Sequence, residues 1–272
     1  MAVVGAIVVV VVLVLLALLG AFTPPSSSHG PNETYSQARP AADSAAQGTS
    51  GGSWSLVIAA GISPSASVTE NVSSASKDCN LTILPGGGSS VTIPAGPAGA
   101  TGGTAPGWVF LYRDAAGELL FVSVINGTAT SWATIAPGQE CSTIFEFLSV
   151  IPSSAIDSSA AAAAVQSDAS GFLAAHPSVS ASYGLVGGVS FLGFHTGAEW
   201  EVNYTTCPLN APSGTAGASF NATVNATTGA VVYQKTQPAI TCRTGTAIDL
   251  SRGESGTSPV DVSLALAVRS RM

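Results

Sequence analysis

The order of apolar and polar positions divides the chain into an apolar start, a short polar spacer and a longer part of alternating segments. No charged or polar side chain occurs between Ala2 and Phe22. A run of about 20 apolar residues is enough to cross a bilayer as a helix. Thr23 to Pro31 then has the Pro/Ser composition of an extended linker. The pattern predicts a transmembrane anchor at 1–23, in contact with the membrane through residues 2–22, followed by a spacer over 24–52.

Two other interpretations of the apolar start stay open. A cleaved signal peptide usually has a basic beginning, an apolar run of about 7–15 residues and a small-x-small cleavage site. This run is longer and has no Lys or Arg before it, which favours an uncleaved anchor. Ala2 to Ile7, followed by Val and Leu, also resembles the filament-forming N-terminal helix of archaeal type IV pilins. That resemblance implies a structural cell-surface subunit.

Beyond the spacer, short β-branched segments separated by Gly, Pro and Ser predict strands. The predicted strands are 54–60, 67–72, 81–84, 91–93, 108–113, 118–126, 183–195, 199–206, 219–225 and 230–234. In the strand at 199–206, Trp200, Val202 and Tyr204 share one face, and the polar side chains, Glu199 and Glu201 included, share the other. We expect that polar face to be solvated. The Gly-rich stretch 94–107 is expected to be a surface loop.

Two segments have helical character. Ser158 to Ala175 combines five consecutive alanines with Val165, Phe172 and Leu173, follows a capping Asp157, and ends at His176. Tyr35 to Gln47 is Ala-rich and can form a short helix if Pro40 occupies its first turn. The predicted fold is α+β, with an N-terminal transmembrane helix, antiparallel sheet or sheets, and one main packing helix at about 158–175.

The sequence also suggests an internal duplication. Trp108-x-Phe-x-Tyr followed by Phe121-x-Ser-x-Ile-Asn-Gly-Thr parallels the strands that contain Trp200 and Phe220. With the short helix before Trp54, two related α+β units are conceivable. The predicted division is a β-rich unit over 53–150, an α+β unit over 151–243, and a tail over 244–272 that is equally compatible with strand or helix.

Charge excludes one class of function. The chain carries 8 Lys+Arg and 15 Asp+Glu, for a net charge of −7, and 8% of its residues are charged. Soluble domains usually have about 25%. Nucleic-acid binding depends on clustered cations that neutralise phosphates, and here the cations are scattered. No nucleic-acid partner is therefore expected.

The asparagines point to an external location. Seven of the eight are followed by x-Ser or x-Thr with x other than Pro, whereas about two such acceptors are expected by chance in a chain this rich in Ser and Thr. Accidental sequons remain the alternative explanation. The candidate glycosylation sites are Asn32, Asn71, Asn80, Asn126, Asn203, Asn221 and Asn225.

The cysteines agree with an oxidising exterior. Cys79, Cys141, Cys207 and Cys242 are even in number and lack the close spacing of zinc or redox pairs. Three connectivities are possible, and buried free thiols are the alternative. We favour Cys207–Cys242 and Cys79–Cys141, because each pair brackets a β-rich stretch.

Catalytic motifs are absent from the sequence. Of His29, His176 and His195, His195 is the one plausible base, and Gly188-Val189-Ser190-Phe191-Leu192 misses the nucleophile elbow at its last position. No H-E-x-x-H, calcium loop or His/Cys cluster predicts a metal. We therefore predict no catalytic residues, no cofactor and no metal, and keep an undetected hydrolase as an alternative.

Residues 153–235 resemble a PepSY-type module. The resemblance rests on Asp157-Ser158-Ser159-x-Ala161 opening a helix, on Trp200-x-Val202-x-Tyr204, and on the turn from Val224 to Val232. PepSY modules are exported or membrane-anchored and accompany peptidases as inhibitory or chaperoning segments. The resemblance implies a non-enzymatic interaction module with an unidentified protein partner, anchored by a single pass with its C-terminal part outside the cell. The low charge and dense sequons favour an archaeal cell-surface source.

Overall fold

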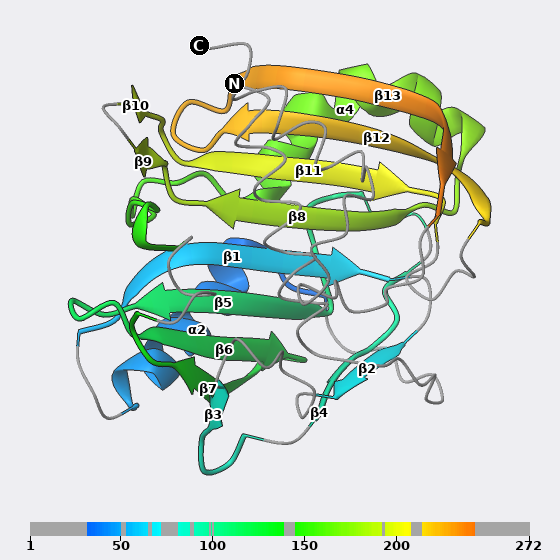
Figure 1. Ribbon diagram of the computed structural model, residues 1–272. Coiled ribbons are helices and arrows are strands. Elements are labelled where there is room, and N and C mark those ends of the chain that lie inside the picture. Colours follow the sequence, from blue (N-terminus) through cyan, green and yellow to red (C-terminus); the bar gives the residue numbers. More distant parts are fainter. Residues whose placement is uncertain are drawn as a thin grey trace.

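One large antiparallel sheet organises the molecule (Figure 1). The computed structural model describes residues 32–49, 53–64, 67–71, 81–87, 90–97, 99, 101–138, 145–191, 194–207 and 214–242. Its nine-stranded sheet has the order β13-β12-β11-β8-β1-β5-β6-β7-β3. Helices α2 (Tyr35–Gln47) and α4 (Ser158–Ala175) cover the same face. The α+β class is confirmed, but the expectation of one packing helix is wrong, because α2 packs on β5, β6 and β7.

Most strands lie where the sequence predicts them. The sheet is built from β1 (Ser55–Ser63), β3 (Leu81–Ile83), β5 (Gly107–Arg113), β6 (Leu119–Ile125), β7 (Thr128–Ile135), β8 (Ser180–Val186), β11 (Glu199–Thr205), β12 (Ala216–Asn225) and β13 (Val231–Thr241). Two small pairs, β2 (Val68–Asn71) with β4 (Ser90–Ile93) and β9 (Ser190–Phe191) with β10 (Phe194–His195), lie in the connections.

Two strand predictions need correction. Strand β7 was not predicted, because Thr, Ser and Ala dominate it and only Trp132 marks it as buried. The single strand predicted over 183–195 is wrong, because β8 ends at Val186. Beyond it the Gly187 N–H donates to Val57 O (2.9 Å), and Gly188 O accepts from Ser149 N (2.6 Å). Side chains at both glycines would collide with backbone, so the chain leaves the sheet there.

The chain folds as two successive halves with the same order of elements. In each half a helix precedes four strands that pair consecutively: α2 with β1, β5, β6 and β7, then α4 with β8, β11, β12 and β13. The first strands of the halves, β1 and β8, pair antiparallel from Ile58↔Val186 to Ser63↔Ala181. This seam makes one sheet of two halves (Figure 1). Strand β3, inserted after β1, extends the outer edge of the first half.

The strand register refines the repeat seen in the sequence. Trp108 pairs with Val124 in the first half and Trp200 with Val224 in the second. Tyr112 likewise pairs with Leu120, and Tyr204 with Phe220. The counterpart of Phe220 is therefore Leu120. The expected match of Phe121 with Phe220 is wrong, because Phe121 packs in the apolar cluster on the opposite face.

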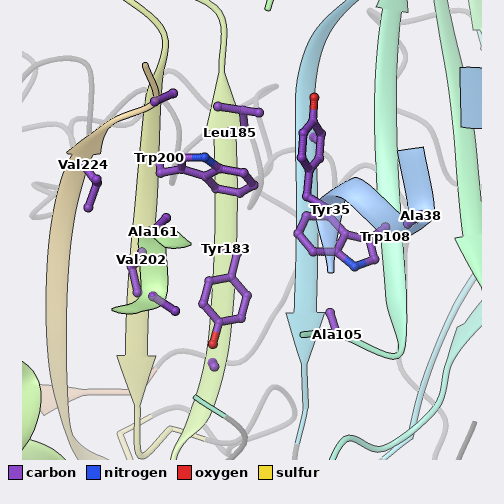
Figure 2. Packing of buried hydrophobic residues seen from close by; sticks show 14 of the residues in the cluster. Tyr35, Ala38, Ala105, Trp108, Ala161, Tyr183, Leu185, Trp200, Val202 and Val224 are labelled. Atoms are coloured by element: carbon purple, nitrogen blue, oxygen red, sulfur yellow. The ribbon is translucent and has the colours of Figure 1, made fainter. Parts of the chain in front are cut away.

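The core between helices and sheet is aromatic at its centre. Trp108 and Trp200 meet edge to face at 6.3 Å, and Tyr35 lies 5.4 Å from the Trp200 ring (Figure 2). Each indole N–H donates to a backbone carbonyl two residues before its own helix: Trp108 to Glu33 O (2.8 Å) and Trp200 to Ile156 O (2.9 Å). The two tryptophans thus hold equivalent positions and fix both helix starts to the sheet.

The N-termini of the two helices hydrogen-bond to each other's residues. Ser158 Oγ accepts from Tyr35 N (2.9 Å) and donates to Gly103 O (2.6 Å). Asp157 Oδ1 accepts from Ser36 N (2.8 Å). Burial acts to raise the pKa of Asp157, but hydrogen bonds from Ser159 and Ser36 hold it below its usual range. The start of the second helix therefore supplies acceptors to two N–H groups at the start of the first.

The connection before β5 is part of this junction. Gly103 and Ala105 are buried, so the expectation of a surface loop throughout 94–107 is wrong. Gly103 N donates to Tyr183 Oη (3.0 Å), and Tyr204 Oη donates to Thr101 O (3.1 Å). A side chain at Gly103 would overlap the Ser158 backbone, so the close approach requires glycine. Small residues let this segment enter the core, and tyrosine hydroxyls satisfy its polar groups.

Helix α2 differs from expectation in one detail. Pro40 is the sixth helical residue, beyond the first turn, and it is exposed. A capping box between Thr34 and Gln37 and a buried Ala38, Ala42 and Ala46 stripe keep the segment helical despite the missing N–H.

The proposed anchor at 1–23 and the tail at 244–272 lie outside the described residues. No helix among the residues that the structure describes is long and apolar enough to cross a bilayer.

Replacing Ser158 tests the helix junction. Ser158→Ala leaves the Tyr35 N–H and Gly103 carbonyl buried without this partner, so we expect a loss of about 1–3 kcal/mol in the free energy of unfolding. Ser170→Ala is the matched control, because the Ser170 hydroxyl is exposed and bonds only within α4. Urea unfolding measures both. Equal stability of the two variants contradicts the assigned role.

Candidate functional site

The helix-free face of the second half carries mostly short polar side chains. We call this surface the polar platform. It consists of Ser180 and Ser182 on β8, Glu199, Glu201, Asn203 and Thr205 on β11, and Ser219, Asn221, Thr223 and Asn225 on β12. Alternation places these residues opposite Tyr183, Trp200 and Phe220, which belong to the core beneath the helices. The sequence predicted this division for β11 and β12.

The same face of the first half is apolar and covered. Val57, Leu111 and Phe121 form a second core with Phe145 and Leu148 from the segment before α4. Arg113 fixes that segment, because its guanidinium donates to the carbonyl oxygens of Phe145 and Leu148. The helix-free face is therefore divided at the β1–β8 seam, apolar and closed on one side and polar on the other.

Two carboxylates form the most unusual part of the platform. Glu199 is 8% exposed and Glu201 is 7% exposed, so the expectation that this pair is solvated is wrong. In register, Glu199 faces Asn225 and Glu201 faces Thr223. Thr223 Oγ1 donates to Glu201 Oε1 (2.7 Å), whereas Glu199 Oε2 is buried without a hydrogen-bond partner among the described residues. Alternation predicted the shared face, but the burial and the Thr223 contact depend on strand pairing.

Burial changes the acidity of both groups. Burial raises the pKa of Glu201 to about 7, although the Thr223 hydrogen bond lowers it, and the neighbouring Glu199 charge raises it further. Burial also raises the pKa of Glu199. The pair can therefore take up or release a proton near neutral pH, or it can be neutralised by a cation.

The sequon asparagines occupy different environments. Asn126 is exposed at the β6–β7 turn with a positive φ of 52°. Asn203 and Asn221 are half-buried cross-strand partners on the platform. Asn225 Oδ1 accepts from Thr227 and Thr228 N–H and so forms the hairpin turn. Asn32 is half-buried, Asn71 is the last residue of β2, and Asn80 lies outside the described residues.

One predicted disulfide is present. Cys207 and Cys242 are bonded, with a Cα–Cα distance of 5.5 Å, and join the end of β11 to the end of β13. Their sulfurs lie against Gly217, where a side chain would collide with both. Cys79 and Cys141 fall outside the described residues, and their pairing remains a prediction.

The histidines give no assembled catalytic site in the described part of the chain. His176 ends α4, as predicted, and its ring packs 4.8 Å from Phe172. His195 pairs with Ser190 in the backbone register of β9 and β10. His29 is not among the described residues. Within those residues, no group of three or more His, Cys, Asp or Glu side chains gathers to bind a metal.

Comparisons with known proteins add no relative. No family model, curated protein or solved structure matches the chain.

The raised pKa of Glu201 predicts pH-dependent stability. The carboxyl ordinarily titrates at 4.5, so folding favours its protonated form, and this contribution is present below pH 4.5 and lost as pH rises through 7. We expect the free energy of unfolding to fall by about 3 kcal/mol between pH 5 and 8. Glu201→Gln flattens this dependence, and the exposed Glu146→Gln keeps it. A wild-type stability that does not change over this range contradicts the burial of Glu201. Urea unfolding across pH provides the measurement.

Strand pairing predicts which sequons carry glycans. The Cα atoms of paired residues are about 5 Å apart, too close for two glycans on one face. Asn203 Nδ2, the attachment atom, already donates to Ser182 Oγ (3.3 Å). We expect glycosylation at the exposed Asn126 and no peptide modified at both Asn203 and Asn221. Mass spectrometry of peptides from the native membrane, spanning both asparagines, tests this. Double occupancy contradicts the register.

Proposed function

We propose that this chain is a non-enzymatic interaction module, held at a cell membrane by residues 2–22 and displayed outside the cell. The docking surface for a protein partner is the half-buried part of the platform, formed by Ser182, Asn203, Thr205, Asn221 and Asn225. The observation that carries this proposal is the asymmetry of the sheet, because α2 and α4 cover one face and, among the described residues, the opposite face of the second half is polar and carries no helix. The bonded Cys207–Cys242 pair and the exposed Asn126 support an oxidising, external setting.

The platform fits a docking role better than the neighbouring sheet edge. Strand β13 is the outer strand, and it exposes Val232 and Tyr233. Yet Pro238 lacks an N–H for strand addition, and Lys235 is exposed on the same strand. Both features oppose the pairing of a further strand at an edge. The half-buried residues of the platform instead offer hydroxyl and amide side chains from three strands, which suit a wet, hydrogen-bonded interface. Ser180, Glu199, Glu201, Ser219 and Thr223 lie buried among them.

The partner we propose is a membrane or exported peptidase. This choice rests on the PepSY resemblance of residues 153–235, whose helix, Trp200 strand and Val224–Val232 turn correspond to α4, β11 and the β12–β13 hairpin. In the turn, Gly229 has a φ of 73°, which requires glycine, and Asn225 caps the loop. A stable hairpin keeps β12 and its polar side chains in place.

Site-specific photo-crosslinking tests the docking face. A photoreactive residue at Thr205 on the platform is compared with one at Gln166 on the exposed side of α4, both in the full anchored chain in its native membrane. We expect Thr205 to crosslink a peptidase and Gln166 not to do so, and we expect faster substrate cleavage by that peptidase when the chain is deleted. Equal crosslinking from both positions, or unchanged cleavage, contradicts the proposal.

The hydrolase alternative is tested separately, because Ser190 and His195 are register partners. We expect no labelling of Ser190 by a fluorophosphonate probe. Labelling that disappears in His195→Ala overturns the non-enzymatic assignment.

A further inference from the structure

Two buried carboxylates lie side by side on the platform without a counter-ion among the described residues. Glu199 and Glu201 are residues i and i+2 of β11, so their Cα atoms are about 7 Å apart on one face. More than nine-tenths of each residue is buried. Among the described residues, one salt bridge is present, between Arg39 and Asp43 on α2, and it involves neither glutamate. Neither glutamate is neutralised by a described Lys, Arg or His.

The hydrogen bonding of the pair is incomplete. Thr223 engages one oxygen of Glu201, and Glu199 Oε2 is buried without a partner among the described residues. Oδ1 of Asn203, the next residue on the same face, is also buried and unpartnered there. A buried, unpaired carboxylate oxygen is expensive and needs a proton, a donor or a cation.

Apart from the Thr223 hydroxyl, no donor among the described residues bonds to the pair. Opposite Glu199 on β12, Asn225 commits its Oδ1 to the turn, and on β8 Val186 and Gly184 face Glu199 and Glu201. No titratable side chain on β8 or β12 faces the two carboxylates in register. The unpartnered atoms at the pair are therefore all oxygens, and oxygen ligands favour a hard cation.

We propose that Glu199 and Glu201 bind one hard divalent cation, calcium or magnesium, between their carboxylates. All-oxygen ligands favour these ions over zinc or copper. With only two carboxylates, water completes the coordination shell, which is the arrangement of a weak site. Dissociation constants of about 10⁻⁴–10⁻³ M are usual for extracellular calcium modules. The sequence motifs predicted no metal, because the two glutamates were expected on a solvated strand face, and only the folded structure shows that both are buried.

Calorimetric titration of the purified full chain in detergent tests the proposal. After removal of metals with a chelator, calcium and magnesium chloride are titrated separately at pH 8. We expect saturable binding of at least one cation, loss of that binding in Glu199→Gln and in Glu201→Gln, and retention in the exposed Glu146→Gln. Binding to one cation alone identifies it as the ligand.

A pH comparison on the unmodified protein keeps the test valid if a variant fails to fold. Because a carboxylate must lose its proton to bind a cation, we expect the cation affinity to be weaker at pH 5 than at pH 8. No binding of either cation, affinity that is equal at both pH values, or binding that survives in the Glu199→Gln, Glu201→Gln double variant overturns the proposal. The partner plays no part here, so failure of this site leaves the crosslinking test of docking unaffected.

Discussion

The contact between the two helix N-termini is the constraint on which the rest of the structure depends. Each N-terminus carries unsatisfied N–H groups and a partial positive charge, so bringing two together is unfavourable unless acceptors lie between them. Asp157 and Ser158 provide those acceptors to α2. The Trp108 and Trp200 indoles then attach the two helix starts to β5 and β11. Helix placement, core and seam are thereby determined together.

Because both helices cover one face of the sheet, the composition of the opposite face differs between the two halves. In the first half that face is closed by Phe145 and Leu148, and in the second half it remains polar. Buried polar groups normally have partners, and on the platform Glu199 and Asn203 retain unpartnered oxygens among the described residues. The fold does not require this cluster of unpartnered oxygen atoms. It is therefore the region to which both proposals assign a ligand or partner.

Particular residues show which features sequence patterns can predict and which they cannot. Period-two alternation identified Trp200, Val202 and Tyr204 as core, and alanine content identified α4. The expected capping of α4 by the Asp157 side chain is wrong, because that carboxylate accepts from Ser36 N of α2 instead. These are local signals. Strand β7, the buried Gly103 and the Leu120–Phe220 equivalence were missed, because each depends on a partner far away in the chain. The burial of Glu201 was missed for the same reason.

The sequence by itself determined the α+β class, both helices and the two-faced character of β11 and β12, and it favoured the pairing of Cys207 with Cys242 without deciding it. Local periodicity and composition carry that information. Only the tertiary structure decided that the halves join through β1 and β8, that α2 belongs to the first half, and that Glu199 and Glu201 are buried beside Thr223. Pairing between distant strands sets burial and hydrogen bonding, and no short stretch of sequence records it.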